Sequence, residues 1–252
     1  MKKTTIGNSI RKFMEESTRT KKARADRECV MGLFNDYLAN YGELESNVER
    51  DPIIVMAPIS KLRPSHFRQF VCWFVIQKVL DRDKSQYVPV LRDFAQWLVE
   101  SKVVGKAISK EILEMLDELQ GEPERCEKMT GLLHEFANRD MPTSAEWRQD
   151  PKSYARKAAV LKAIHHEKPQ RILDGYFTVA RTGPGALWLR PGDPDDDEED
   201  LAPRKSSGPE IGPVQVPAEA AKLARVGDRL CAAIGKMSDF WKLLETGGVY
   251  PG

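Results

Sequence analysis

Apolar residues recur every three or four positions over most of the first 166 residues, which is the period of an amphipathic α-helix. Three of the earlier stripes include aromatic side chains, and such helices bury their stripes best against one another. The pattern therefore predicts a compact helical bundle at the front of the chain. The predicted helices cover residues 9–16, 30–41, 67–78, 88–99, 112–119, 122–138 and 152–166.

Residues typical of helix ends stand at the borders of these segments. Gly42 is expected to close the helix before it, because glycine accepts the backbone conformations that end helices. Pro64 suits the first turn of a helix, where its missing N–H costs nothing. Ser85 is a candidate N-cap, and Gly105 and Gly121 are candidate stops.

The apolar period changes near Ile172, where apolar and polar residues begin to alternate as in a strand. Strands are expected over residues 176–181, 186–190, 229–235 and 240–245, with a short helix over 217–224 and a closing segment at 247–251. The first two strands form a hairpin around the glycines of residues 182–185. This set predicts a small antiparallel barrel. Its order resembles an SH3-like barrel, with a Gly-Asp turn, a strand, a Trp-Lys-Leu strand and a short last strand.

The predicted fold class is therefore α+β, with an all-α bundle followed by a small barrel. The expected parts are the bundle at 1–120, a helical connection at 121–171 and the barrel at 172–252. Within the barrel, residues 191–213 contain five prolines and a run of seven acidic residues from Asp193 to Asp200. Such a segment cannot bury apolar surface, so a mobile acidic loop is expected there.

The total charge of the 252-residue chain is close to zero, with 39 basic and 38 acidic residues, yet its charges are unevenly distributed. Residues 1–112 carry 20 basic and 14 acidic side chains, whereas residues 173–252 carry 9 and 13. A basic front end favours nucleic acid as a partner, although an ordinary solvated surface also explains this excess. The candidate contacts to nucleic acid are Arg11, Lys12, Arg19, Lys21, Lys22, Arg24, Arg27, Lys61, Arg63, Arg68 and Arg92.

The order of the front helices also resembles a known family. A basic helix with Tyr37 near its end is followed by Leu-Arg-Pro-Ser-His-Phe at 62–67 and by Leu-Arg-Asp-Phe-Ala-Gln-Trp-Leu at 91–98. These features are similar to the SAM-like core-binding domain of tyrosine recombinases and phage integrases, over about residues 8–110. The resemblance implies a helical domain that contacts the phosphates of DNA.

The catalytic motif of that family has no counterpart after residue 112. His165 and His166 lack the arginine that should follow, and Tyr250 lacks a preceding histidine. Without arginines to stabilise the developing phosphorane charge, a tyrosine is a poor phosphoryl acceptor. We therefore expect no recombinase activity and no catalytic residues.

Other chemistry has little support in the sequence. The four cysteines are scattered and the four histidines show no ligand spacing, so neither a metal site nor a disulfide framework is expected. Phosphate-binding glycine motifs and a nucleophile elbow are absent, and no cofactor is expected. With no apolar run long enough to span a membrane and no signal-peptide pattern, we expect a cytoplasmic location and no membrane partner.

Three functions agree with these observations. The first is a non-catalytic protein that binds nucleic acid, DNA above all, through the basic helical domain. The second is a protein-interaction or scaffold protein that uses the barrel to hold a protein partner. The third is an enzyme whose site the known motifs do not reveal.

Overall fold

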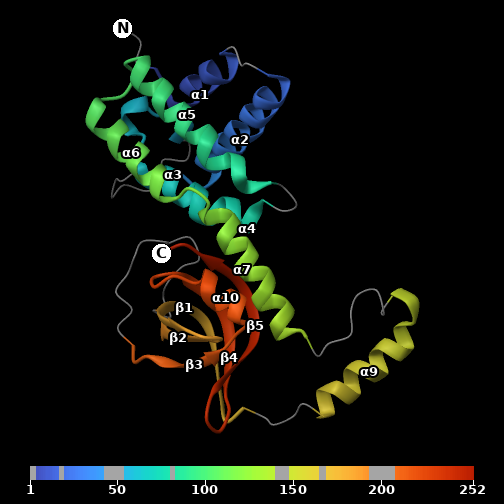
Figure 1. Ribbon diagram of the computed structural model, residues 1–252. Helices are drawn as coiled ribbons and strands as arrows, with labels where there is room; N and C mark the ends of the chain where they lie inside the picture. The colour runs from blue at the N-terminus through green and yellow to red at the C-terminus, as the bar shows by residue number, and fades with distance from the viewer. Residues whose placement is uncertain are drawn as a thin grey trace. The chain divides into compact units, whose positions relative to one another are not determined.

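The computed structural model describes residues 4–16, 20–42, 54–79, 83–139, 148–164, 169–192 and 208–252. These residues form two compact units, Met1–Glu124 and Arg125–Gly252. The predicted α+β architecture, a helical region followed by a small β-barrel, is confirmed (Figure 1). Among the described residues, no helix is long and apolar enough to cross a membrane.

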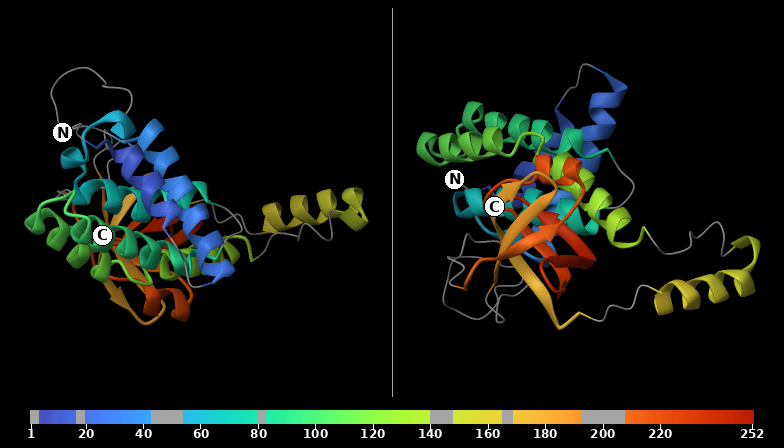
Figure 2. Two further views of the ribbon diagram at one scale, coloured as in Figure 1. Left: turned by 90° about the horizontal axis from the view of Figure 1, so that it is seen from above. Right: turned by 60° about the horizontal axis from the view of Figure 1, so that its bottom comes forward.

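The first unit is built from helices and short helical turns. Its α-helices are α1 (Ile6–Glu15), α2 (Lys21–Asn40), α3 (Pro64–Gln69), α4 (Val75–Lys78), α5 (Tyr87–Glu100) and α6 (Lys106–Glu118). Short turns of helix lie at η1 (Ile54–Met56), η2 (Ile59–Lys61) and η4 (Lys84–Gln86), and one π turn, η3 (Phe70–Phe74), joins α3 to α4. Figure 2 shows α1 and α2 lying side by side, in agreement with the contacts between them.

Aromatic rings form the core of this unit, as the stripes predicted. Phe34 is fully buried on α2 and its ring lies 5.0 Å from the rings of Phe67 and Phe70. Phe94 of α5 closes the cluster, 6.5 Å from Phe34 and 5.3 Å from Phe13 of α1. Ring pairs at these separations contribute beyond their buried area, so the cluster fixes how the helices pack.

The helix ends agree with the sequence in part. Thr5 and Thr20 cap α1 and α2 by accepting backbone N–H bonds, and Pro64 starts α3 as expected. Ser85 does not cap α5; instead its own N–H donates to the Asp83 carboxylate at the start of η4. The prediction was wrong because an extra helical turn precedes α5.

The second unit contains helices α7 (Glu122–Ala137), α9 (Pro151–Ile164) and α10 (Ala218–Leu223), with the first residues of α7 belonging to the first unit. Its strands are β1 (Arg171–Gly183), β2 (Ala186–Pro191), β3 (Ile211–Gln215), β4 (Arg229–Lys236) and β5 (Trp241–Tyr250). They close into a barrel in the order β1-β2-β3-β5-β4 around a core of buried aliphatic side chains and Phe177. The predicted hairpin is present, with Gly185 in a left-handed conformation in its turn.

The barrel differs from the expected all-antiparallel arrangement at one junction. Helix α10 carries the chain from β3 to β4, so that β3 and β5 lie next to each other and run parallel. The strand order with a helix between β3 and β4 makes this a five-stranded Greek-key barrel, the class to which OB-folds belong. The other strand pairs of the described barrel, β1–β2, β2–β3, β1–β4 and β4–β5, are antiparallel.

Two further predictions about the strands were wrong. Residues 211–213 belong to β3, although they were expected to lie in the loop of residues 191–213, because Pro213 stands where the register between β2 and β3 shifts. The closing segment at 247–251 is continuous with the strand before it, because a register shift between β4 and β5 accommodates Gly247 as a bulge. The acidic run of residues 193–200 lies outside the described residues.

Candidate functional site

The predicted basic residues of the helical unit are exposed to different degrees and have different partners. Arg11, Lys12, Lys21 and Lys22 are exposed on α1 and α2, and Lys61 is exposed in η2. Arg19 lies outside the described residues. Hydrogen bonds from Ser85 lower the pKa of the Asp83 carboxyl, and the nearby charge of Lys22 lowers it further by a smaller amount.

Other members of the set are already engaged inside the unit. Arg27 donates to the carbonyl oxygens of Phe13 and Glu16, and its guanidinium lies 4.3 Å from the centre of the Phe13 ring, so it fastens α2 to α1. Arg63 donates to the carbonyl oxygens of Ser60 and Leu62. Arg68 is half-buried on α3.

Two members of the set pair with acidic side chains. Arg24 bonds Glu28 one turn further along α2 at 2.8 Å, and Arg92 of α5 lies 3.1 Å from Asp117 of α6. Both pairs are exposed, and their acids reduce the positive field that a phosphate would meet. Of the ten described candidates, four are therefore held by acids or carbonyl oxygens: Arg24, Arg27, Arg63 and Arg92.

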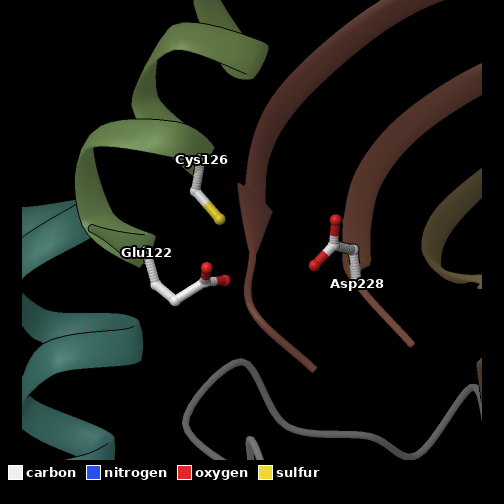
Figure 3. A group of neighbouring side chains, drawn as sticks. All are labelled: Glu122, Cys126 and Asp228. Carbon is white, nitrogen blue, oxygen red and sulfur yellow. The ribbon is translucent and has the colours of Figure 1, made fainter. Parts of the chain in front are cut away.

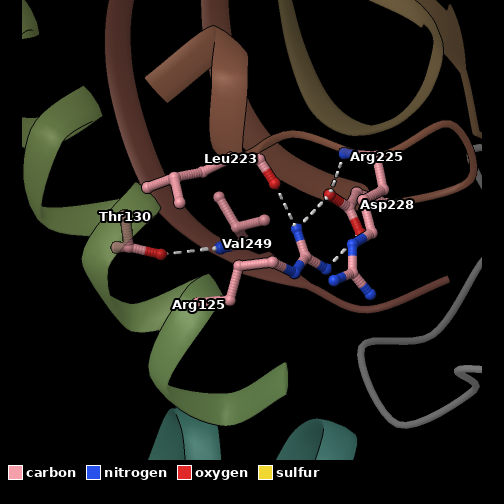
Figure 4. A network of polar contacts seen from close by, with 6 residues as sticks. All are labelled: Arg125, Thr130, Leu223, Arg225, Asp228 and Val249. Carbon is pink, nitrogen blue, oxygen red and sulfur yellow. Dashed lines mark hydrogen bonds and ion pairs between the residues drawn. The ribbon is translucent and has the colours of Figure 1, made fainter. Parts of the chain in front are cut away.

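In the second unit, a buried polar network fixes helix α7 to the barrel. The Arg125 guanidinium donates to both oxygens of Asp228 at 2.7 Å and to the carbonyl oxygen of Leu223 at 2.8 Å (Figure 4). The backbone N–H of Arg225 also donates to Asp228 at 2.7 Å. The two charged side chains are only 9% and 2% exposed, so this network is structural and not part of an accessible site.

Glu122, Cys126 and Asp228 are the one described group with ligand atoms close enough to hold a metal ion. Glu122 and Cys126 lie one turn apart on α7, and Asp228 belongs to the barrel (Figure 3). Both carboxylate oxygens of Asp228 already accept bonds from Arg125, and a metal ion there would have to displace that buried cation. The donor set is therefore better suited to an ion pair than to a metal.

The accessible cluster of the barrel lies on the outer face of β1, β2 and β3 and centres on Trp188. The inward neighbours of Trp188 on β2, Leu187 and Leu189, are fully buried, so its indole projects from the outer face. The Arg181 guanidinium of β1 stacks 3.7 Å above the centre of this indole. Glu210, just before β3, holds Arg181 through an ion pair at 3.1 Å.

Two glycines make room for the indole on this face. A Cβ atom on Gly212 would lie 2.5 Å from the indole Cδ1, and a Cβ atom on Gly183 would lie 2.8 Å from Cζ3. Side chains at these positions would push the ring away from the sheet, so the glycines allow it to lie close against β1 and β3. We call the set Gly183, Gly212, Trp188, Arg181 and Arg190 the aromatic-arginine face.

The outermost groups of the aromatic-arginine face are cations. The Arg181 side chain is 57% exposed, although its guanidinium is held from one side by the indole and from its edge by Glu210. Arg190 is exposed two residues after Trp188, on the same side of β2. A planar cation lying flat on an aromatic ring offers a second planar surface to a ligand.

The sequence pattern did not single out this face. The sequence predicts only a strand at Trp188, a turn at Gly183 and a loop at Gly212, because their proximity depends on the pairing of β1, β2 and β3. The signal that could have found the face is a tryptophan on a strand whose predicted neighbours each carry a glycine.

No family model, no curated protein and no solved structure matches this chain. The likeness of the first unit to a recombinase core-binding domain is therefore carried by the sequence features alone.

Proposed function

We propose that this protein is a non-catalytic nucleic-acid-binding protein that uses the aromatic-arginine face to hold single-stranded nucleic acid. The observation that carries the proposal is the stack of Arg181 on Trp188 at 3.7 Å, exposed on the outer face of a five-stranded Greek-key barrel. In OB-type barrels, strands β2 and β3 and the adjoining loops are the usual surface for oligonucleotides. A shared fold does not by itself imply a shared function, so the proposal rests on the chemistry of the residues on this face.

Stacking is the chemistry that this face supplies. Proteins that hold single strands without a strict sequence requirement combine aromatic rings with cations, because every base has a flat face and every nucleotide a phosphate. The exposed side of the Arg181 guanidinium is flat and positively charged. In this proposal a nucleobase stacks on that side, so that the guanidinium lies between the nucleobase and the Trp188 indole. Arg190, next along β2, is placed to pair with a phosphate.

The side chains of Trp188 and Arg181 are held in position before the nucleic acid binds. The indole is confined against Gly183 and Gly212, and the guanidinium is held by Glu210, so that little side-chain entropy is lost on binding. A face that is already ordered is one that a flexible single strand can use without rearranging the sheet.

In this proposal the helical unit adds contacts to phosphates. Lys12, Lys21, Lys22 and Lys61 are its exposed lysines from the predicted set. Such contacts increase affinity and its salt dependence without reading sequence. The resemblance to the recombinase core-binding domain supports this part of the proposal.

The test uses one substitution that keeps the positive charge but removes the planar guanidinium, and another that removes the aromatic ring. Arg181→Lys retains the cation beside Glu210 but cannot stack, and Trp188→Leu removes the ring beneath it. Binding of a fluorescein-labelled dT20 oligonucleotide is measured by anisotropy. We expect each variant to raise Kd about 5- to 150-fold, because one lost base–aromatic stack costs about 1–3 kcal/mol.

Arg171→Lys is the matched control, because Arg171 is also an exposed arginine on β1. It is expected to leave Kd within about twofold of the wild type, since a single exposed charge is conserved. If Arg181→Lys binds as tightly as Arg171→Lys, only charge matters and the stacking proposal is wrong. Thermal unfolding of each variant checks that the barrel is intact.

A further inference from the structure

Helix α9 differs in charge from the other helices of its unit. Its fourteen residues, Pro151–Ile164, include four basic side chains and no acidic one. The helix starts at Asp150, whose carboxylate accepts the backbone N–H groups of Lys152 and Ser153. Asp150 thus serves the helix start, and the body of α9 from Pro151 to Ile164 contains cations and no acidic residue.

The cations of α9 lie on its surface. No residue from 151 to 159 is buried, and Lys152, Arg156 and Lys157 are all exposed. Lys152 and Arg156 are four residues apart, which places them one above the other on the same face of the helix. Like charges at this spacing destabilise a helix, so the arrangement costs stability in the absence of an anion.

The apolar residues of α9 argue against a lipid surface as that anion. They are four alanines together with Tyr154, Val160, Leu161 and Ile164, and the helix contains neither tryptophan nor phenylalanine. Helices that lie in a membrane interface usually present large apolar side chains such as Trp, Phe and Leu opposite their basic face. A basic helix that lacks tryptophan and phenylalanine anchors fits a polyanion that is contacted through the charges of the helix.

We infer that α9 is a second contact to nucleic acid, one that binds the phosphate backbone through Lys152, Arg156 and Lys157. This inference rests on the proposed function, because it names a further surface for the same ligand. The aromatic-arginine face contacts bases by stacking, whereas α9 contributes charge. Each phosphate that is neutralised releases counterions, and the number of such contacts is read from the salt dependence of binding.

The test neutralises the three cations in the full chain. Lys152→Gln, Arg156→Gln and Lys157→Gln are combined, because glutamine has nearly the helix propensity of lysine and arginine. Binding of labelled dT20 is measured over a series of salt concentrations. The slope of log K against log salt is expected to fall by about 2, since each phosphate contact to a single strand contributes about 0.7.

A second triple variant, Lys102→Gln, Lys106→Gln and Lys110→Gln, is the matched control. It removes the same charge from exposed lysines in and beside α6, where acidic residues are interspersed. Its slope is expected to stay within about 0.5 of the wild-type slope, because it removes no phosphate contact. Equal slopes for the two triple variants would overturn the role of α9.

Three further outcomes separate the inference from the proposed function. If Trp188→Leu weakens binding while the α9 variant keeps the wild-type slope, the proposed function stands and the inference is wrong. If the wild type does not bind dT20 even at low salt, both are wrong. If wild-type protein binds phosphatidylserine vesicles, the α9 variant does not, and both bind dT20 with the same slope, α9 is a membrane contact and the inference is overturned.

Discussion

Replacing Asp228 with asparagine is expected to loosen helix α7 from the barrel. Asp228 accepts two bonds from Arg125 and one from the backbone N–H of Arg225, each 2.7 Å long. Asparagine keeps the size of the side chain but removes its charge and one of its acceptor oxygens. The Arg125 guanidinium, whose side chain is only 9% exposed, would then lose the carboxylate that accepts two of its hydrogen bonds.

The size of the effect follows from this burial. Breaking a buried ion pair by removing one partner costs about 3–5 kcal/mol, because the remaining charge has lost its compensation. The Arg92–Asp117 pair of the helical unit offers a matched comparison, since its side chains are 53% and 52% exposed. Asp117→Asn is expected to cost at most about 1 kcal/mol, because water already solvates both groups.

Hydrogen exchange at one amide reports this loosening directly. The backbone N–H of Val249 in β5 donates to the Thr130 hydroxyl of α7 at 3.0 Å, so its protection depends on the docking of that helix. In Asp228→Asn its exchange should accelerate roughly 100- to 4000-fold, at about tenfold for each 1.4 kcal/mol. In Asp117→Asn it should change less than about tenfold. Equal protection of Val249 in the wild type and Asp228→Asn would refute the view that this ion pair holds α7.

Three other substitutions or reactions probe separate parts of the account. Gly131→Ala, at an exposed position inside α7 with no atom within 4 Å of the added Cβ, should raise the unfolding free energy of the second unit by about 0.5–1 kcal/mol in urea titration; a lower value would contradict this. Gly212→Ala should displace the indole of Trp188 and weaken dT20 binding. Unchanged affinity would show that the position of the indole against Gly212 does not affect binding. Burial raises the pKa of the Cys72 thiol to about 12, so iodoacetamide at pH 8 should modify the half-buried Cys231 before Cys72, as followed by peptide mass spectrometry; earlier labelling of Cys72 would contradict its burial.

The helical unit was predictable because its pattern and its packing obey the same rule. Residues such as Phe34, Phe67 and Phe94 stand at helical spacing in the sequence, and their rings meet in the core. Local spacing is sufficient to place an apolar residue on the inner face of its helix. The partners of exposed cations are a different matter, since Arg27 and Arg92 bind groups that are distant in sequence.

The barrel was harder to derive because glycine and proline have two meanings in strands. Pro213 ends most strand patterns, yet here it occupies an irregular point of pairing in β3. The Gly247-Gly248 pair is typical of a turn, yet Gly247 is a bulge in one long strand. Only the pairing of strands far apart in sequence separates these meanings, and it also brings Gly183 and Gly212 beside Trp188.

The charge of α9 was hidden by averaging. The region around it, residues 113–172, carries 10 basic and 11 acidic side chains, because neighbouring segments supply the acids. Knowledge of the helix bounds separates its four cations from those acids. Net charge counted over a whole region therefore concealed a purely basic helix.

The most direct test of the central claim is to map where a single strand touches the protein. An oligonucleotide of dT20 containing 4-thiothymidine is irradiated with the full-length protein, and the crosslinked peptides are identified by mass spectrometry. We expect crosslinks at residues 181–190, which contain Arg181 and Trp188, and their loss in Trp188→Leu. Crosslinks confined to the helical unit, with none at residues 181–190, would contradict it.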